Sequence, residues 1–162
     1  MITIASRIAQ VLSTRLALIQ VANGYETDAG LRVYRGRVIM SADDMEPGPL
    51  IVIYPVQGAS TEVPIEGLET RVRNELRLSV LGMAVPGDMD HPLDMAFDLI
   101  GDIKRALFQS IAPLIDAGER ISEPPEYTGS RIALPEPGEQ TVVAGVDVMI
   151  RYFEQRGNPG AT

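Results

Sequence analysis

The feature that most constrains this fold is a long, regular alternation of apolar and polar residues at 70–85. The apolar side chains are Val72, Leu76, Leu78 and Val80, and the polar ones between them are Arg71, Arg73, Glu75, Arg77 and Ser79. Successive side chains of a β-strand point to opposite faces of the sheet, so a period of two predicts a strand with one apolar and one charged face. Such a strand suits a sheet that is covered by other elements on one face only.

Two segments have helical spacing instead. Apolar residues recur every three or four positions at 4–21, and Asn23-Gly24 then supplies a left-handed stop. A second helix is predicted from Pro92, with Asp90 as its N-cap. Its expected buried stripe comprises Leu93, Phe97, Ile100, Ile103 or the stem of Lys104, and Leu107.

Four further strands are predicted from shorter patterns, at 31–40, 50–54, 131–134 and 141–153. The segment at 50–54 is continuously apolar and β-branched, which is typical of a strand buried on both faces. Between the elements, loops are expected at 43–49, 56–69 and 118–139. The last two are long enough to suggest contact with partners.

This order of elements predicts an α+β fold, with a mostly antiparallel β-sheet and two main helices packed on one face. A chain of 162 residues is expected to form one domain, here residues 1–155. The Gly- and Pro-containing end, residues 156–162, is expected to be a disordered tail.

Composition excludes several kinds of site. The chain has no Cys, which removes disulfides, thiol nucleophiles and Cys-ligated metals, and its one His, His91, cannot form a His-pair zinc site. Glycine-rich phosphate motifs are missing. We therefore expect no enzyme, no catalytic residues, no metal and no cofactor. No secretory signal or membrane-spanning run is visible, so no membrane partner is expected.

The charge balance narrows the partners further. The net charge is −8, and Lys104 is the only Lys beside thirteen Arg, of fourteen basic residues in all. A chain this acidic is a poor candidate for wrapping nucleic acid, which needs a dense basic surface. The planar, multi-donor guanidinium of Arg suits carboxylates across packed interfaces, although a high-GC genome also favours Arg.

Two rows of charge are the candidate interaction residues. Asp94, Asp98 and Asp102 recur every fourth residue on the second helix, as a solvated face, an Arg-paired interface or a metal site. Arg71, Arg73 and Arg77 share a strand face, which fits a charged edge strand, a phosphate groove or a surface for an acidic partner. One hypothesis is that the Arg row faces the Asp row of a neighbouring subunit.

Read in order, the segments resemble the tail terminator (tail completion) proteins of long-tailed bacteriophages. The resemblance extends to about Glu154, and its most distinctive part is GYETDAGLRVYRGR at 24–37. The strand PLIVIY at 49–54, the helix PLDMAFDLIGDIKRALF at 92–108 and a last strand ending in Tyr-Phe-Glu at 152–154 follow it.

The resemblance implies a structural virion protein of the tail or neck, assembled in the bacterial host cytoplasm. Family membership would imply that the chain forms a ring, expected to be a hexamer, on the head-proximal end of the tail tube. The ring would end tube polymerisation and provide the head–tail joining surface. The implied partners are further copies of the chain, the tail tube protein and the head–tail connector, with DNA only passing through the lumen.

Other functions are compatible with the same residues. A head–tail connector or neck protein would assemble on the connector rather than on the tube. A small acidic metal-binding module would use the stripe from Asp94 to Asp102, and an intracellular binding domain for an unidentified ligand is also compatible.

Overall fold

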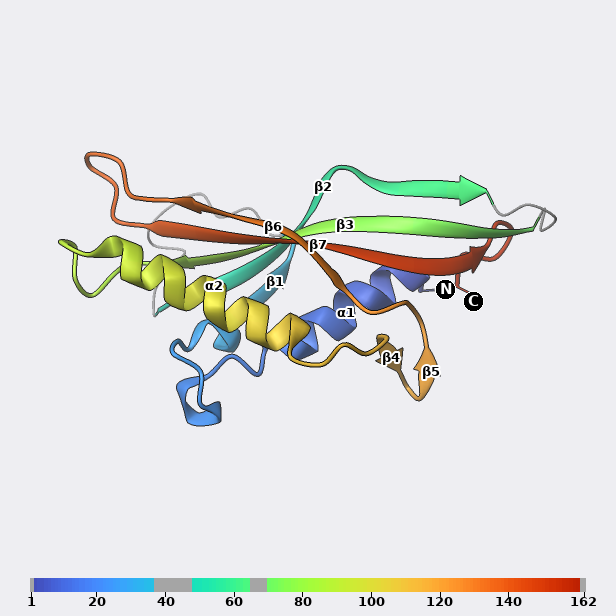
Figure 1. Cartoon of the computed structure of the whole chain (residues 1–162), viewed down its shortest axis with the longest axis horizontal. Coiled ribbons are helices and arrows are strands. Elements are labelled where there is room, and N and C mark those ends of the chain that lie inside the picture. Colours follow the sequence, from blue (N-terminus) through green and yellow to red (C-terminus); the bar gives the residue numbers. More distant parts are fainter. Residues whose placement is uncertain (1, 37–47, 65–69, 161–162) are drawn as a thin grey trace.

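A five-stranded sheet and two α-helices make up most of the computed structural model, which describes residues 2–36, 48–64 and 70–160 (Figure 1). The main elements are α1 (Ile4–Leu16), β1 (Val33–Arg35), β2 (Leu50–Pro64), β3 (Arg71–Ala84), α2 (Pro92–Phe108), β6 (Glu126–Ala133) and β7 (Val142–Gln155). Shorter elements are the 3₁₀ turns η1 (Val21–Asn23) and η2 (Ala29–Leu31) and the strands β4 (Ile115–Asp116) and β5 (Glu119–Arg120).

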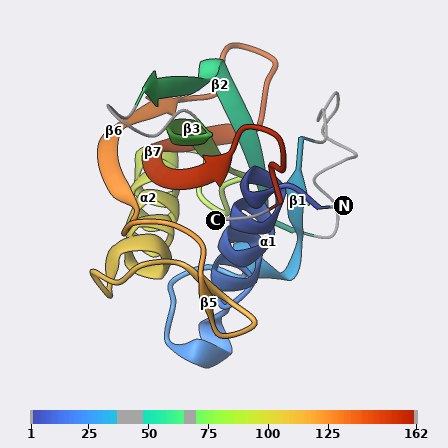
Figure 2. The same cartoon turned by 90° about the vertical axis from the view of Figure 1, so that its right-hand side faces the viewer.

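The strand order in the sheet is β1-β2-β3-β7-β6. Its described neighbours are antiparallel except β1 and β2, and β3 pairs with β7 along its whole length. Figure 2 shows both helices beneath the same face of the sheet. The predicted α+β fold, with a mostly antiparallel sheet and two helices on one face, is confirmed. Of the helices in the described ranges, none is long and apolar enough to cross a lipid bilayer.

The core lies between the helices and the apolar face of the strands. In α1, the residues Ile4, Ile8, Leu12 and Leu16 are fully buried, as spacing by four predicts. The even residues of β7 from Val142 to Tyr152 are buried in the same core, where β7 packs against α2, which agrees with the alternation of these residues in the sequence. Strand β2 is buried on both faces at its start: Ile51 joins the main core, and Val52 joins a small cluster on the open face.

The N-terminal segment differs from its prediction in where the elements end. Helix α1 stops at Leu16 rather than at residue 21, because the next backbone bonds are of the tighter i→i−3 kind, from Leu18 to Arg15 and from Ile19 to Leu16. The expected left-handed stop is at Gly24, with φ +81°. The strand expected at 31–40 begins only at Val33, while residues 37–40 and most of the loop at 43–49 lie outside the described residues.

Two expected loops contain strand. Strand β2 runs through most of the segment 56–69 to Pro64, with a register shift between Pro55 and Ser60, and residues 65–69 lie outside the described residues. Strand β6 begins at Glu126, five residues before the predicted strand, and has a shift between Tyr127 and Gly129. The shifts correspond to three extra residues in β2 and one extra residue in β6, which breaks the alternation that a sequence reading follows.

The segment after β7 is placed by backbone hydrogen bonds as far as it is described. The amide of Arg156 donates to the carbonyl oxygen of Thr70, and the amide of Ile4 donates to that of Pro159. Residues 156–160 therefore differ from the disordered tail that their composition predicts. Residues 161–162 lie outside the described part.

Candidate interaction surfaces

The three aspartates of α2 do not form one surface. Asp94 and Asp98 are exposed, whereas Asp102 is only 3% exposed. Its carboxylate accepts hydrogen bonds from the backbone amides of Glu26 (3.1 Å) and Thr27 (2.8 Å) and from Thr27 Oγ1 (2.8 Å). A helix turns by about 80° over eight residues, which brings Asp102 onto the inner flank while Asp94 stays outside. The assignment of Asp102 to an interface is therefore wrong.

Asp102 fixes the most distinctive stretch of the sequence. Its carboxylate holds Glu26 and Thr27, and Arg105, one turn further along α2, holds the two residues before them. Arg105 donates from Nη1 to the carbonyl oxygen of Gly24 (2.6 Å), and its guanidinium carbon lies 4.6 Å from the centre of the Tyr25 ring. Gly30 donates to the carbonyl oxygen of Ile19 (2.8 Å). Residues 24–30 thus connect the turn after α1 to α2, which gives this part of the motif a structural role.

The divided stripe also bears on the metal-binding alternative. A divalent cation needs several oxygen ligands around one point, but Asp102 faces the amides of residues 26 and 27 rather than Asp94 or Asp98. Across residues 2–36, 48–64 and 70–160, no three His, Asp or Glu side chains come together as a metal site.

The arginine row lies on the open face of a central strand. Because β3 pairs with β2 on one side and β7 on the other, the interpretation of a charged edge strand is wrong. Arg71 and Arg77 are exposed, and Arg73 is half-buried with its Nε atom buried and unbonded. Arg77 approaches Glu75 at 3.7 Å.

Most charges around this row are paired within the sheet. Arg151 of β7 donates to Glu75 (3.0 Å) and to Glu126 of β6 (2.9 Å). The bond from Arg151 holds the pKa of the Glu75 carboxyl below its usual value, and the same bond raises the pKa of Arg151. Arg131 of β6 bonds both oxygens of Asp147 at 2.9 Å. This part of the face is neutralised by cross-strand ion pairs and offers little free charge.

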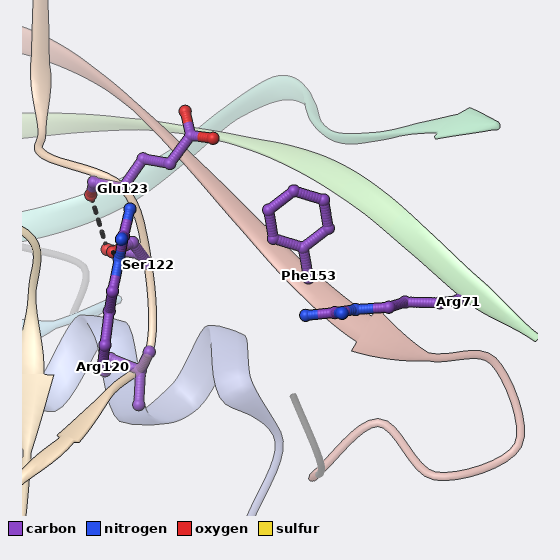
Figure 3. A pocket seen from close by; sticks show the side chains of 6 residues that line it. Arg71, Arg120, Ser122, Glu123 and Phe153 are labelled. Carbon is purple, nitrogen blue, oxygen red and sulfur yellow. Dashed lines mark hydrogen bonds between the residues drawn. The ribbon is translucent and has the colours of Figure 1, made fainter. Parts of the chain in front are cut away.

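A pocket at one end of the sheet is lined by two arginines and one glutamate. We call it the arginine pocket, and it is lined by Arg71, Arg120, Ile121, Ser122, Glu123 and Phe153. Figure 3 shows Arg71 and Phe153 on one side and Arg120 on the other, with the guanidinium carbon of Arg71 4.9 Å from the Phe153 ring centre. Arg120 Nε donates to the Ser122 carbonyl oxygen (3.3 Å). In the described part of the chain, neither arginine is in an ion pair.

The opposite end of the molecule is acidic. This end is made by the loop before α2, the start of α2 and the loop between β6 and β7. Its acidic residues are Asp88, Asp90, Asp94, Asp98, Glu136 and Glu139, and there is no Lys or Arg at 85–103 or 132–150. His91 Nδ1 lies 2.8 Å from Asp88, and the bond holds the pKa of the Asp88 carboxyl below its usual value. Asp90 is not the N-cap; His91 occupies that position without a side-chain bond.

Two apolar residues of α2 are exposed within this acidic region. Leu93 is 41% and Phe97 56% exposed, so their assignment to the buried stripe is wrong. The residues that α2 buries are Ala96, Leu99, Ile100, Asp102, Ile103 and Leu107. Leu93, Phe97, Asp94 and Asp98 together form what we call the α2 patch, an apolar strip with carboxylates beside it.

The sequence reading found Arg71, Asp94 and Asp98 but missed Arg120 and Phe153. Arg120 lies in a segment that the sequence marks only as loop, and Phe153 belongs to the odd face of β7, where Asp147 and Arg151 indicate solvent. Only the pairing of β3 with β7 brings Arg71 and Phe153 together.

No protein-family model matches this chain, and no curated protein matches its sequence.

Proposed function

We propose that this chain is a structural subunit that assembles with copies of itself into a ring, and that the ring caps the head-proximal end of a phage tail tube. The observation that carries the proposal is the asymmetry of charge along the long axis. In the part of the chain that the structure describes, no ion pair includes the carboxylates Asp90, Asp94, Asp98, Glu136 and Glu139, which belong to the end where α2 starts. Arg71 at the start of β3 and Arg120 of β5, also without an ion pair there, belong to the other end (Figure 1). The resemblance of the sequence to tail terminator proteins is the reason for placing this ring on a phage tail tube.

Unlike, complementary ends favour a head-to-tail contact between copies. Such a contact uses two different surfaces of each subunit, and it yields a closed ring when the rotation between neighbours divides a full turn. A surface that paired with itself would give a dimer instead. The acidic end and the arginine pocket are two different surfaces, so the charge pattern supports a ring.

The net charge supports the passage of DNA without binding to it. At −8 the subunit repels phosphates overall, and a ring of such subunits would let DNA slide through. The outer partners of the ring would be the tail tube protein on one side and the head–tail connector on the other.

We expect native mass spectrometry over a concentration series to detect a closed ring, most simply a hexamer, with annular particles in negative stain from the same samples. A subunit that is monomeric alone should form its ring when purified tail tubes are added, and should then be found at one tube end. Binding to isolated connectors but not to tubes would identify a neck protein. A chain that neither self-associates nor binds tubes or connectors would refute the proposal.

A further inference from the structure

The arginine pocket has the features of a receptor for an acidic, aromatic surface. Both arginines line the same pocket, and the Phe153 ring provides an apolar wall beside the guanidinium of Arg71 (Figure 3). Arginine forms paired hydrogen bonds with carboxylates and stacks on aromatic rings. Glu123 also lines the pocket, but its charge acts on Arg151 and contributes to raising that residue's pKa.

The α2 patch has the complementary chemistry. Phe97 projects from the helix with more than half of its surface exposed, and Asp94 and Asp98 lie beside it. In the described part of the chain, neither carboxylate takes part in an ion pair. Buried aromatic residues ringed by paired charges are typical of the residues that dominate binding at protein interfaces.

The two surfaces cannot meet within one molecule. The start of α2 lies at one end of the long axis, and the start of β3 and the end of β7 lie at the other (Figure 1). We infer that the α2 patch of one copy binds in the arginine pocket of the next copy, with Asp94 and Asp98 paired to Arg71 and Arg120. This inference rests on the proposed ring and names the contact that closes it.

The contact differs from the pairing suggested by the sequence in three residues. Asp102 is excluded by its burial, Arg77 approaches Glu75, and Arg73 is half-buried in the sheet. Their places are taken by Phe97 on the patch and by Arg120 and Phe153 in the pocket. Charge complementarity between the two ends of the same chain is the reason for choosing a second copy as the occupant.

The test uses two variants that each reverse one surface. In Arg71→Glu/Arg120→Glu, an acidic pocket meets an acidic patch. In Asp94→Arg/Asp98→Arg, a basic patch meets a basic pocket. We expect each variant alone to need at least tenfold more protein to form rings, or to lose tube-end binding where the ring forms only on tubes. An equimolar mixture should regain rings of alternating subunits, because each altered surface then meets its opposite.

The matched control is Arg35→Glu/Arg77→Glu, which changes the net charge as much as the pocket variant but alters exposed arginines outside the pocket. It should assemble like the original chain, and circular dichroism should show that all variants fold. Variants that assemble normally, or a mixture that stays dissociated while the original chain forms rings, would overturn the contact and leave the ring proposal intact. Failure of the original chain to assemble or bind tubes would instead refute the proposed function.

Discussion

Replacing Asp102 by alanine is expected to lower the free energy of unfolding by about 3 kcal/mol. The substitution removes the acceptor for the amides of Glu26 and Thr27 and for the Thr27 hydroxyl. The Thr27 donors are buried, so they would lose their partner without gaining water. A hydrogen bond to a charged acceptor contributes about 1.5–3 kcal/mol, and part of this is offset because a buried charge is no longer desolvated.

The measurement is urea unfolding followed by far-ultraviolet circular dichroism, at one low protein concentration so that assembly does not add to stability. Asp98→Ala is the matched control, because Asp98 lies on the same helix and is exposed. We expect it to change the free energy of unfolding by less than about 0.5 kcal/mol. Equal effects of the two substitutions would show that the Asp102 hydrogen bonds do not hold residues 26 and 27.

The contrast between Asp98 and Asp102 shows what a sequence pattern cannot reveal. Both occupy the same spacing on one helix, and nothing local distinguishes an exposed carboxylate from one that binds amides about 75 residues earlier. The acceptor and its donors come together only in the packed molecule. The sequence does not predict the exposure of Phe97 for the same reason, because Leu93 and Phe97 also fit the apolar stripe of a helix.

The fold was predictable wherever one face of an element is buried along its whole length. Every even residue of β3, and every even residue of β7 from Val142 to Tyr152, is buried toward the helices, and α1 keeps its spacing of four. The reading failed where the period changes within an element. The register shifts at 55–60 in β2 and at 127–129 in β6 exchange the two faces, so the alternation breaks there and the sequence predicts loops for both segments.

The motif at 24–37 is the most distinctive part of the resemblance, but it is not part of the inferred contact between copies. Its described part contributes Thr27 and Gly30 to packing between α1 and α2, and neither side of the inferred contact lies within it. A sequence can resemble a family through residues that hold the fold, while the surfaces that recognise partners lie elsewhere. The charges of the pocket and the patch are therefore the part of the proposal that needs its own test.

Replacing Gly30 by alanine tests the packing of this motif, and we expect a loss of about 3 kcal/mol or more in the free energy of unfolding. A β-carbon at this position would lie 2.5 Å from the carbonyl oxygens of Leu16 and Ile19 and 2.8 Å from the Ile19 amide nitrogen. All three are backbone atoms, so no side chain can rotate to make room. The turn after α1 would have to move away, which would strain the hydrogen bond from Gly30 to Ile19.

Gly101→Ala is the control, and it is expected to change the free energy of unfolding in the opposite direction. Gly101 lies within α2, and a β-carbon there would have nothing within 4 Å. Alanine is favoured over glycine in a helix by about 1 kcal/mol, so this variant should unfold at a higher urea concentration than the original chain, while Gly30→Ala unfolds at a lower one. If both substitutions stabilised the protein, the close approach of residue 30 to the end of α1 would be refuted. Opposite shifts would show that the glycine of the motif is required by the backbone that lies against it.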